Sequence, residues 1–397
     1  MFNYVLLFEK QNDKSNLIAQ YPPKIDVPDS ALISRLCIPS TLYHSKTEVF
    51  AFNTQSNYCF SYAFIFQNTP YSITIVSATL YASLYFDFLH AVDGSFLETN
   101  EKSDPMCRFG LVKSLILSWA TDNNNDLIVN FPFDSFALNL LTVSSWFVNF
   151  NVAPLSPYFM EVWYAALMNE GVLIIAPTAE IASSAVFGIL SMLDRLKYFD
   201  KILLYTEKCD PRYKEILEHD LPYKIVGTTD PNLANGASHF SAIITIRANH
   251  FDNMFDQQHE FRTKTIRLFG YFLIQMNMQL MTDPYSDMLN KEVNVEELLK
   301  ICNGEYPGEV FQKVQKTETF MKWRKHVSDR EQLRDAFLSV PPKEAIKVIK
   351  PEFYELALEQ LRIISNTYVR DQHFQSVLKQ HIHLITKKLK KKSADKS

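Results

Sequence analysis

The hydrophobic and polar pattern is clearest over residues 159–187, where it predicts a helix, a strand and a second helix. Apolar side chains recur at the i, i+3, i+4 and i+7 positions of one helical face: Met160, Trp163, Tyr164 and Leu167. Asn169 to Gly171 then supply a break that ends the first helix. This order is typical of a domain in which helices cover a sheet.

The strand is expected at Val172–Ala176, a continuous apolar run that suits a parallel sheet buried on both faces. Pro177 closes it, and Thr178 is the predicted N-cap of the second helix, with Glu180 in the first turn where the helix dipole favours a carboxylate. The buried stripe of that helix is expected to contain Ile181, Ala185, Ile189 and Leu193.

Residues 1–151 are predicted to form a module rich in antiparallel strands. The expected strands are β-rich runs separated by polar turns: Val5–Glu9, Val49–Asn53, Tyr58–Phe66, Tyr71–Ala78 and, near the end, Leu127–Phe133. Leu80–Leu97 has helical spacing and is expected to cover one face of the sheet.

Residues 152–256 are predicted to form an α/β domain with a mostly parallel sheet, because helices and strands alternate there. Val152–Pro157, which contains two prolines, is the expected linker into it. The further elements expected are strands at Lys201–Tyr205, Tyr223–Thr228 and Ser241–Ile246 and a helix at Pro211–His219.

Residues 257–397 are predicted to form a helical domain. Its periodic segments are Arg262–Met278, Glu309–His326, Arg330–Leu338, Lys343–Ser365 and Asp371–Leu389. The fold class is therefore α+β and α/β, with a helical C-terminal domain.

Composition indicates a globular, cytoplasmic protein. The chain has 397 residues, of which 47% are hydrophobic, and five cysteines spread without a CxxC pair, which favours neither a zinc site nor a disulfide framework. The net charge of −4 argues against nucleic acid as a partner. The uncharged stretches Asn53–Phe86 and Ser135–Met160 contain too many amides and prolines to be membrane spans, and are interpreted as strands.

Motifs for side-chain or cofactor catalysis are missing from the sequence. With nine glycines in all, there is neither GxGxxG nor GxxxxGK[ST], nor GxSxG, nor HExxH, so no cofactor is predicted. The D-x-N-x-D start at Asp122 resembles a calcium loop, but Leu127 and Phe133 stand where glycine and glutamate are needed, so calcium is rejected. His381 and His383 lie two residues apart on a helix and are interpreted as surface residues rather than metal ligands.

Several stretches resemble the tripartite DENN module, which has upstream, central and downstream parts. In the first part they are YPP at Tyr21–Pro23, LISRLCIPS at Leu32–Ser40 and the strand and helix of Tyr71–Val92. In the central part, three stretches are similar to the DENN-domain protein 6 subgroup: VWYAALMNEGVLIIAPTAEIASSAV, DPRYKEI at Asp210–Ile216 and KIVGTTDPNLAN at Lys224–Asn235. The downstream part is represented by Thr319–Leu338.

This resemblance implies a longin-like upstream module and a guanine-nucleotide exchange factor for a Rab-type small GTPase, acting in endosomal traffic. The GTPase would lie across the upstream module and the central and downstream lobe, and the protein could be peripheral on endosomes. Two alternatives stay open. One is a DENN-like adaptor without exchange activity; the other is an enzyme with a flavodoxin-like domain, whose ligand would bind beyond Val172–Ala176 and Tyr223–Thr228.

Two surfaces are candidates for binding. The first is the loop GTTDPN at Gly227–Asn232, where Gly227 is expected to supply an unusual backbone angle and the exposed polar groups are Thr228, Thr229, Asp230 and Asn232. The alternative is that Asp230 or Thr229 only caps the next helix. The second is the lysine-rich tail, Lys387, Lys388, Lys390, Lys391 and Lys392, which is either a solvated helix end or attracted to anionic membranes.

Overall fold

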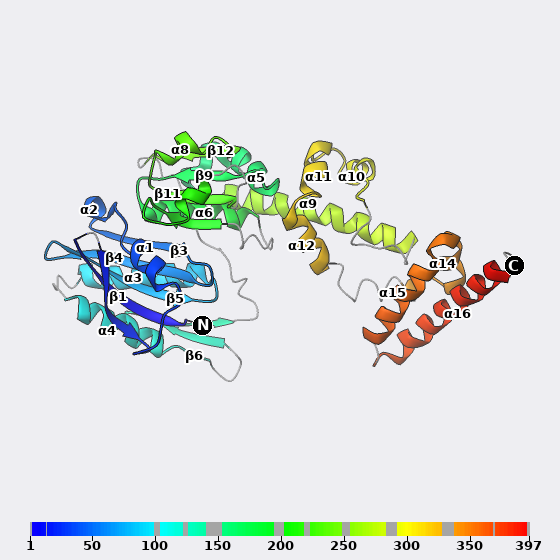
Figure 1. Ribbon diagram of the computed structural model, residues 1–397, viewed down its shortest axis with the longest axis horizontal. Helices are drawn as coiled ribbons and strands as arrows, with labels where there is room; N and C mark the ends of the chain where they lie inside the picture. The colour runs from blue at the N-terminus through cyan, green and yellow to red at the C-terminus, as the bar shows by residue number, and fades with distance from the viewer. Residues whose placement is uncertain are drawn as a thin grey trace. The chain divides into compact units, whose positions relative to one another are not determined.

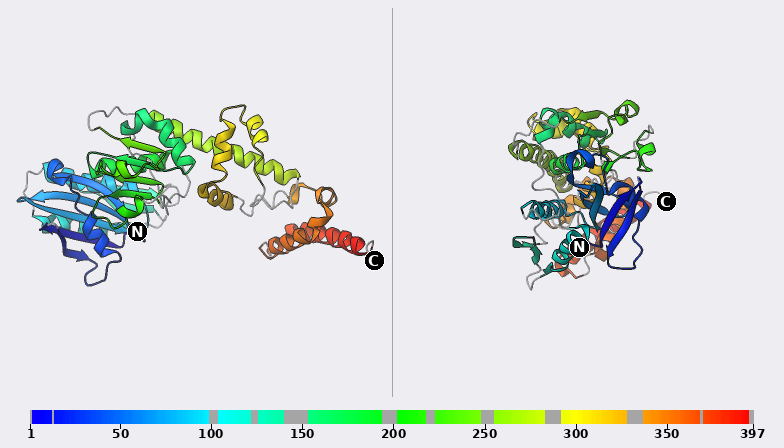
Figure 2. Two further views of the ribbon diagram at one scale, coloured as in Figure 1. Left: turned by 45° about the horizontal axis from the view of Figure 1, so that its top comes forward. Right: turned by 90° about the vertical axis from the view of Figure 1, so that its left-hand side faces the viewer.

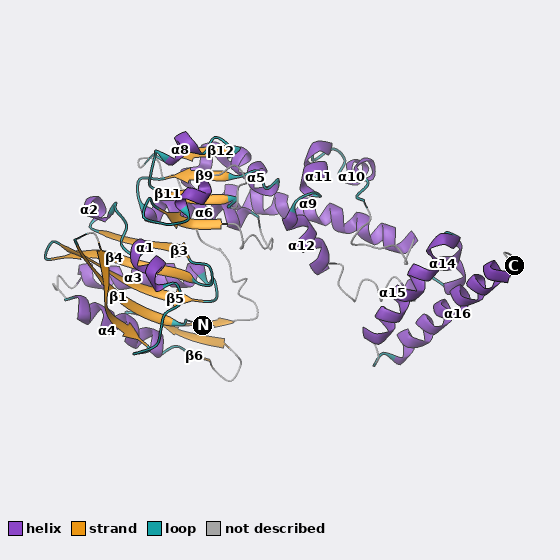
Figure 3. Cartoon of the chain, viewed as in Figure 1, coloured by secondary structure: helices purple, strands orange, loops and turns teal. Residues whose placement is uncertain are grey.

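The computed structural model describes residues 2–12, 14–98, 104–121, 126–139, 153–193, 202–217, 223–247, 255–282, 292–327, 337–367 and 370–394. The chain divides into two compact units, Met1–Thr263 and Lys264–Ser397. The described part of the first unit contains three sheets with their helices, and the described part of the second unit is helical (Figure 1, Figure 3).

A five-stranded antiparallel sheet begins the first unit. Its strands are β1 Tyr4–Gln11, β2 Lys14–Tyr21, β3 Thr47–Asn53, β4 Tyr58–Phe66 and β5 Thr69–Ser77, in the order β2-β1-β5-β4-β3. Short helices α1 Ser30–Leu36 and α2 Leu42–Ser45 lie between β2 and β3 in the chain. The antiparallel fold of this module is as predicted. Strand β2 was not predicted: its apolar run is only three residues long, Leu17–Ala19, and none of its side chains is fully buried.

Two helices pack on this sheet, and a small second sheet follows. Helix α3 Ala82–Glu98 lies against β3 and β4, as predicted, while α4 Pro105–Leu117 lies against β1. The small sheet has strands β6 Ala120–Thr121, β7 Asp126–Asn130 and β8 Ser135–Asn139. Strand β7 is shorter than the predicted Leu127–Phe133, because the Phe131 amide donates to the Asp134 carbonyl and so begins a turn.

The central sheet is parallel throughout, as predicted. Its strands are β9 Val172–Ile175, β10 Ile202–Thr206, β11 Ile225–Thr228 and β12 Ala242–Thr245, in the order β10-β11-β9-β12. The predicted linker contains the 3-10 helix Ala153–Tyr158, in which Leu155 is fully buried. The opening helix is α5 Phe159–Leu167, and Asn169 and Gly171 have positive φ at its end.

Helix α6 Ala179–Met192 lies between the central sheet and strand β3 of the first sheet (Figure 1). The Thr178 hydroxyl accepts from the Ile181 amide at 3.2 Å, which confirms the predicted N-cap. The sequence predicts one buried stripe, but the helix is buried on both sides. For example, the ring of Phe187 packs edge-on against that of Phe86 in α3, with 5.7 Å between the ring centres. Helices α7 Tyr213–Ile216 and α8 Leu233–Gly236 cover the opposite face of the sheet through Ile216 and Leu233.

Helix α9, Phe255–Thr282, runs across the boundary between the units. The other helices of the second unit are α10 Val295–Ile301, α11 Gly308–Val314, α12 Glu318–Val327, α14 Pro342–Val348, α15 Tyr354–Thr367 and α16 Gln372–Ala394, with a 3-10 turn at Pro351–Phe353. The predicted helix Glu309–His326 is divided by Thr317, whose hydroxyl caps α12 by accepting from the Phe320 amide. The predicted helix Lys343–Ser365 is interrupted at Pro351, and most of the predicted Arg330–Leu338 helix lies outside the described residues.

Candidate partner surface at the carboxyl ends of the central strands

The N-terminal module and the central sheet meet at the loop that follows β10. The Glu207 carboxylate accepts from the Ser40 amide at 2.8 Å and from the Ser40 hydroxyl at 3.1 Å, and it also accepts from the Tyr205 hydroxyl. Arg35 donates to the Cys209 carbonyl at 3.4 Å. The surface here is therefore continuous across both modules.

A buried ion pair shapes the same loop. Both Nε and Nη2 of Arg212 bind the Asp210 carboxylate, at 2.8 Å for the shortest contact, and the Thr206 hydroxyl donates to that carboxylate at 2.9 Å. Asp210 and Arg212 are 2% and 7% exposed. Buried charges persist only when they are paired and hydrogen-bonded, so these contacts fix the loop in one conformation.

The structure places the four predicted loop residues together but corrects the role of Thr228. This side chain is fully buried, and its hydroxyl donates to the Thr206 carbonyl at 2.8 Å while accepting from the Asp230 amide at 3.1 Å. The burial follows from the position of β11 between β10 and β9 in the central sheet, where all four residues of the strand are buried. Thr228 is a structural residue, not an exposed one.

Asp230 organises the exposed part of the loop. Its carboxylate accepts from the Tyr213 hydroxyl at 2.7 Å and from the Asn232 amide at 2.9 Å, and lies 3.6 Å from the Lys208 ammonium. Burial alone would raise the pKa of Asp230, but these donors together hold it below its ordinary value. Thr229 is half-buried beside the Tyr205 hydroxyl, and Asn232 is exposed. The side chains that this rigid loop pair exposes to solvent include Lys208, Cys209, Pro231 and Asn232.

Gly227 has a different function from the one expected. It lies within β11 and has no positive φ; a Cβ at this position would come 2.5 Å from the Leu204 carbonyl oxygen and 3.1 Å from the Ala182 carbonyl oxygen. Glycine is therefore required because α6 and β10 approach the backbone closely, not because the turn needs an unusual angle.

The amino-terminal end of α6 holds two carboxylates, Glu180, which was expected in the first turn, and Glu48, which the sequence did not single out. Glu48 of β3, 2% exposed, accepts from the Ala179 amide at 3.0 Å and from the Ser45 hydroxyl at 2.7 Å. Glu180 accepts from the Val49 amide of β3 at 3.3 Å, and Ser183 accepts from the Ala51 amide at 3.2 Å. Two backbone amides of the edge strand β3, those of Val49 and Ala51, therefore find their hydrogen-bond acceptors in side chains of α6. One signal was available: Glu48 directly precedes the predicted strand Val49–Asn53 and is the only charged residue between Thr47 and Phe86.

Burial raises the pKa of Glu180 to about 7, and the neighbouring carboxylates Glu48 and Asp93 add to this effect. His90 of α3 lies 3.6 Å from Glu180, and burial lowers the pKa of its imidazole. Burial therefore favours the neutral form of both groups.

The position of Glu48 bears on the flavodoxin-like alternative. A helix N-terminus that follows a parallel strand is the usual binding position for a ligand phosphate in such folds. Here the Ala179 amide is already engaged by the Glu48 carboxylate of the same chain. A phosphate at this place would also meet a buried negative charge, which weakens the case for nucleotide or flavin binding there.

The lysine-rich tail lies on α16. Lys387, Lys390 and Lys391 are exposed, whereas Lys388 donates to the Ile346 carbonyl at 3.3 Å, so its ammonium is drawn toward α14. Lys392 belongs to the helix, but its side chain lies outside the described residues.

The two histidines of α16 have different environments. His383 is exposed as expected, but His381 is fully buried, packs edge-on against Phe337 at 5.1 Å, and has its pKa lowered by burial to about 4. The surface interpretation is therefore wrong for His381. Among the residues the structure describes, no cluster of three or more His, Cys, Asp or Glu could hold a metal ion.

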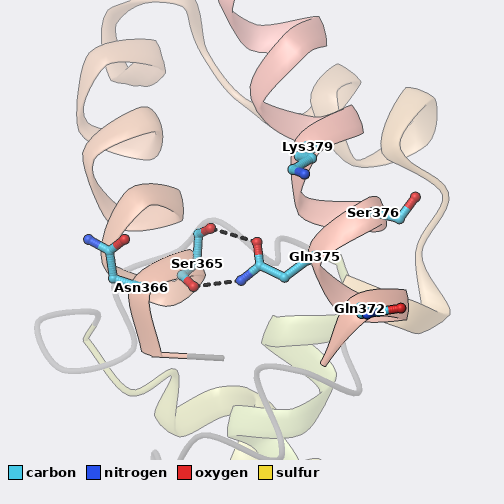
Figure 4. A pocket seen from close by; sticks show the side chains of 6 residues that line it. All are labelled: Ser365, Asn366, Gln372, Gln375, Ser376 and Lys379. Carbon is cyan, nitrogen blue, oxygen red and sulfur yellow. Dashed lines mark hydrogen bonds between the residues drawn. The ribbon is translucent and has the colours of Figure 1, made fainter. Parts of the chain in front are cut away.

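A polar pocket of about 410 Å³ lies where α15 ends and α16 begins (Figure 4). Its lining residues are Ser365, Asn366, Gln372, Gln375, Ser376 and Lys379. Gln375 binds both the hydroxyl and the carbonyl of Ser365, at 2.8 and 2.6 Å, and so joins the two helices. With this pair satisfied, the pocket offers only one charged side chain and no set of converging groups.

No helix in the described ranges is both long and apolar enough to cross a membrane. No protein-family model matches the chain, and no curated protein matches it. The DENN resemblance therefore rests on the local stretches quoted above, together with the order of the three kinds of structure along the chain.

Proposed function

We propose that the protein is a guanine-nucleotide exchange factor for a Rab-type small GTPase, with the partner bound across the N-terminal module and the central domain. The proposal combines the DENN-like stretches with the observed order of an antiparallel module, a parallel α/β sheet and a helical region.

The observation that carries the proposal is the junction between Glu207 and Ser40. A partner that spans two modules gains binding energy from both only when they are held in one arrangement, because ordering them on binding would cost free energy. Glu207 binds Ser40 through two hydrogen bonds, and the edge of β3 is joined to α6 by Glu48, Glu180 and Ser183. The two modules therefore offer one preformed surface.

Exchange requires no catalytic side chain. A protein that binds the nucleotide-free GTPase more tightly than the loaded form shifts the equilibrium toward nucleotide release, and the shift is limited by the difference between the two affinities. A rigid surface suits this role because it can favour one conformation of a flexible partner.

The proposal is tested by the release of labelled GDP from a panel of Rab proteins. The wild-type chain should accelerate release from at least one of them. Replacing the exposed pair, Lys208→Ala with Asn232→Ala, should reduce the acceleration about tenfold, the effect of losing roughly 1.4 kcal/mol of interface energy. The matched control, Lys300→Ala with Gln312→Ala, removes an exposed lysine and an exposed amide side chain from the second unit.

Failure to accelerate release across the whole panel would contradict the proposal, as would tight binding of GTP or ATP by the chain itself. Binding of a nucleotide-free Rab without faster release would instead support the adaptor alternative. Both outcomes are measured on the same purified proteins.

A further inference from the structure

Positive charge is concentrated in the last helices. Residues 337–394 carry eleven Lys and Arg against five Asp and Glu, a net charge of +6 in a chain whose total is −4. The tail lysines seen in the sequence account for only part of this excess. Outside the tail there are six Lys and Arg against five Asp and Glu, so that part contributes only +1; its basic residues are Lys343, Lys347, Lys350, Arg362, Arg370 and Lys379.

Helices α14, α15 and α16 share one core, which decides where their charges lie. The core is formed by Phe337, Ala345, Ile346, Ile349, Tyr354, Ala357, Leu361, Phe374, Leu378, His381 and Ile385. Helices α15 and α16 lie side by side in both Figure 1 and Figure 2. Because these apolar faces point inward, the lysines of the same helices are left on the outside.

The contacts of Lys388 bring α14 beside the basic half of α16. Its ammonium lies 3.3 Å from the Ile346 carbonyl of α14 and 5.9 Å from the centre of the Tyr354 ring. Lys343 and Lys347, one helical turn apart on α14, are exposed, as is Lys350 just beyond it. Lysines separated by about forty residues in the chain are therefore neighbours in the fold.

An exposed aromatic side chain lies beside these lysines. Phe353 is 50% exposed, directly precedes Tyr354, and its amide donates to the Lys350 carbonyl at 3.0 Å. Tyr354 is buried next to Lys388, so its neighbour Phe353 lies at the same end of the helical group. Acidic side chains lie here too: Glu344 pairs with Lys347 at 2.7 Å, and Glu352 and Glu355 are exposed on either side of Phe353 and Tyr354.

We propose that this basic aromatic face, defined as Lys343, Lys347, Lys350, Phe353, Lys387 and Lys391, docks on the anionic surface of a lipid membrane. Clustered lysines are attracted to anionic headgroups, and an aromatic ring among them can enter the headgroup region. The face contains no arginine, which is the residue suited to bidentate recognition of a single phosphate. Diffuse attraction to many headgroups therefore fits it better than a specific site for one phosphate or for nucleic acid.

The test uses the full chain and two kinds of vesicle, one of phosphatidylcholine alone and one containing phosphatidylserine. The wild type should float with the anionic vesicles only, and salt should weaken the binding because the attraction is screened. Each lysine near the surface contributes roughly 1 kcal/mol, or about fivefold in affinity. The triple variant Lys343→Ala, Lys387→Ala and Lys391→Ala should therefore bind about 100-fold more weakly. The matched control is Lys24→Ala, Lys214→Ala and Lys300→Ala, which removes the same charge elsewhere.

Insertion of the aromatic residue has a separate measurement. In a Phe353→Trp variant, the added fluorescence should shift to the blue on anionic vesicles. Phe133, 68% exposed in the β7–β8 turn, provides the control variant Phe133→Trp, which should show no shift.

Equal binding to both kinds of vesicle would overturn the proposal, and so would a triple variant that binds as well as its control. Retention on a soluble polyanion such as heparin, without vesicle binding, would assign the face to another anionic partner. Because the assay contains no GTPase, its outcome is independent of the proposed exchange activity.

Discussion

The Glu48 carboxylate accepts a hydrogen bond from the Ala179 amide at 3.0 Å, across 131 residues of chain. One residue is on the edge strand of the antiparallel sheet and the other begins the helix that covers the parallel sheet. A carboxylate at a helix N-terminus is stabilised by the free amides and the helix dipole. This contact therefore joins the two modules: the helix amide gains an acceptor, and the buried carboxylate gains a donor.

Removing this carboxylate should destabilise the first unit. We expect Glu48→Ala to lower the free energy of unfolding by about 3 kcal/mol, because it leaves the buried Ala179 amide without its acceptor. Glu48→Gln retains an acceptor and should cost only about 1 kcal/mol. Urea denaturation measures both. Asp26→Asn, on an exposed side chain of the same unit, should change the value by less than about 0.5 kcal/mol. Equal effects of Glu48→Ala and Asp26→Asn would refute this role.

The stability of the same junction should depend on pH through Glu180. Its pKa is about 7 in the folded protein, above the value of 4.5 for a free side chain, so the folded state retains a proton that the unfolded state releases. The stability that protonation provides is therefore present below about pH 4.5 and is lost as the pH rises toward 7. The carboxyl is partly exposed, so solvent screening limits the expected change to the order of 1 kcal/mol.

The measurement compares wild type with Glu180→Gln from pH 4.5 to 8, because other groups titrate over the same range. Both proteins retain the neighbours of Glu180 and His90, which are Glu48, Asp87 and Asp93. The wild type should lose stability relative to the variant as pH rises, and the difference should level off above pH 7. A difference that stays constant with pH would show that Glu180 titrates normally.

Local signals were sufficient to predict much of the fold. Thr178 caps α6 because its hydroxyl lies close in sequence to the Ile181 amide, from which it accepts a hydrogen bond. Strand β9 is buried along its whole length, as its continuous apolar run predicts. These predictions depend on contacts between residues close in sequence, which periodicity and residue type reveal.

The candidate site depended on distant contacts and was predicted only in part. The loop at Thr228–Asn232 was located correctly at the carboxyl end of β11, but Thr228 is buried because it is the last residue of a strand that lies between β10 and β9. Ser40 and Glu207 are 167 residues apart, and nothing in the sequence around either of them indicates the other. Strand order and register decide these contacts, and neither can be derived from one strand alone.

The corrected role of Thr228 gives a prediction that separates structure from binding. Thr228→Val removes the hydroxyl from the Thr206 carbonyl and the Asp230 amide, so it should lower the free energy of unfolding by about 1 to 2 kcal/mol. Asn232→Ala alters an exposed side chain and should leave stability within about 0.5 kcal/mol while weakening GTPase binding. The double variant Thr228→Ala with Asn232→Ala should therefore melt at a lower temperature than wild type. Thermal melting that is unchanged in Thr228→Val would contradict the buried position of this hydroxyl.

Close packing of α6 on the central sheet should make Gly227 intolerant of any side chain. The ideal Cβ of Gly227→Ala would lie 2.5 Å from the Leu204 carbonyl oxygen and 3.1 Å from that of Ala182, and both are backbone atoms that can move only if β10 or α6 shifts. We expect Gly227→Ala to lower the free energy of unfolding by about 1 to 3 kcal/mol because of this overpacking.

Gly110→Ala provides the opposite case, because Gly110 lies inside helix α4 and a Cβ there meets no atom within 4 Å. Alanine should stabilise that helix by about 1 kcal/mol, since it restricts the unfolded chain and has the higher helix propensity. Denaturation of the two variants side by side tests the packing: if Gly227→Ala were as stable as Gly110→Ala, helix α6 would not lie as close to β11 as these distances require.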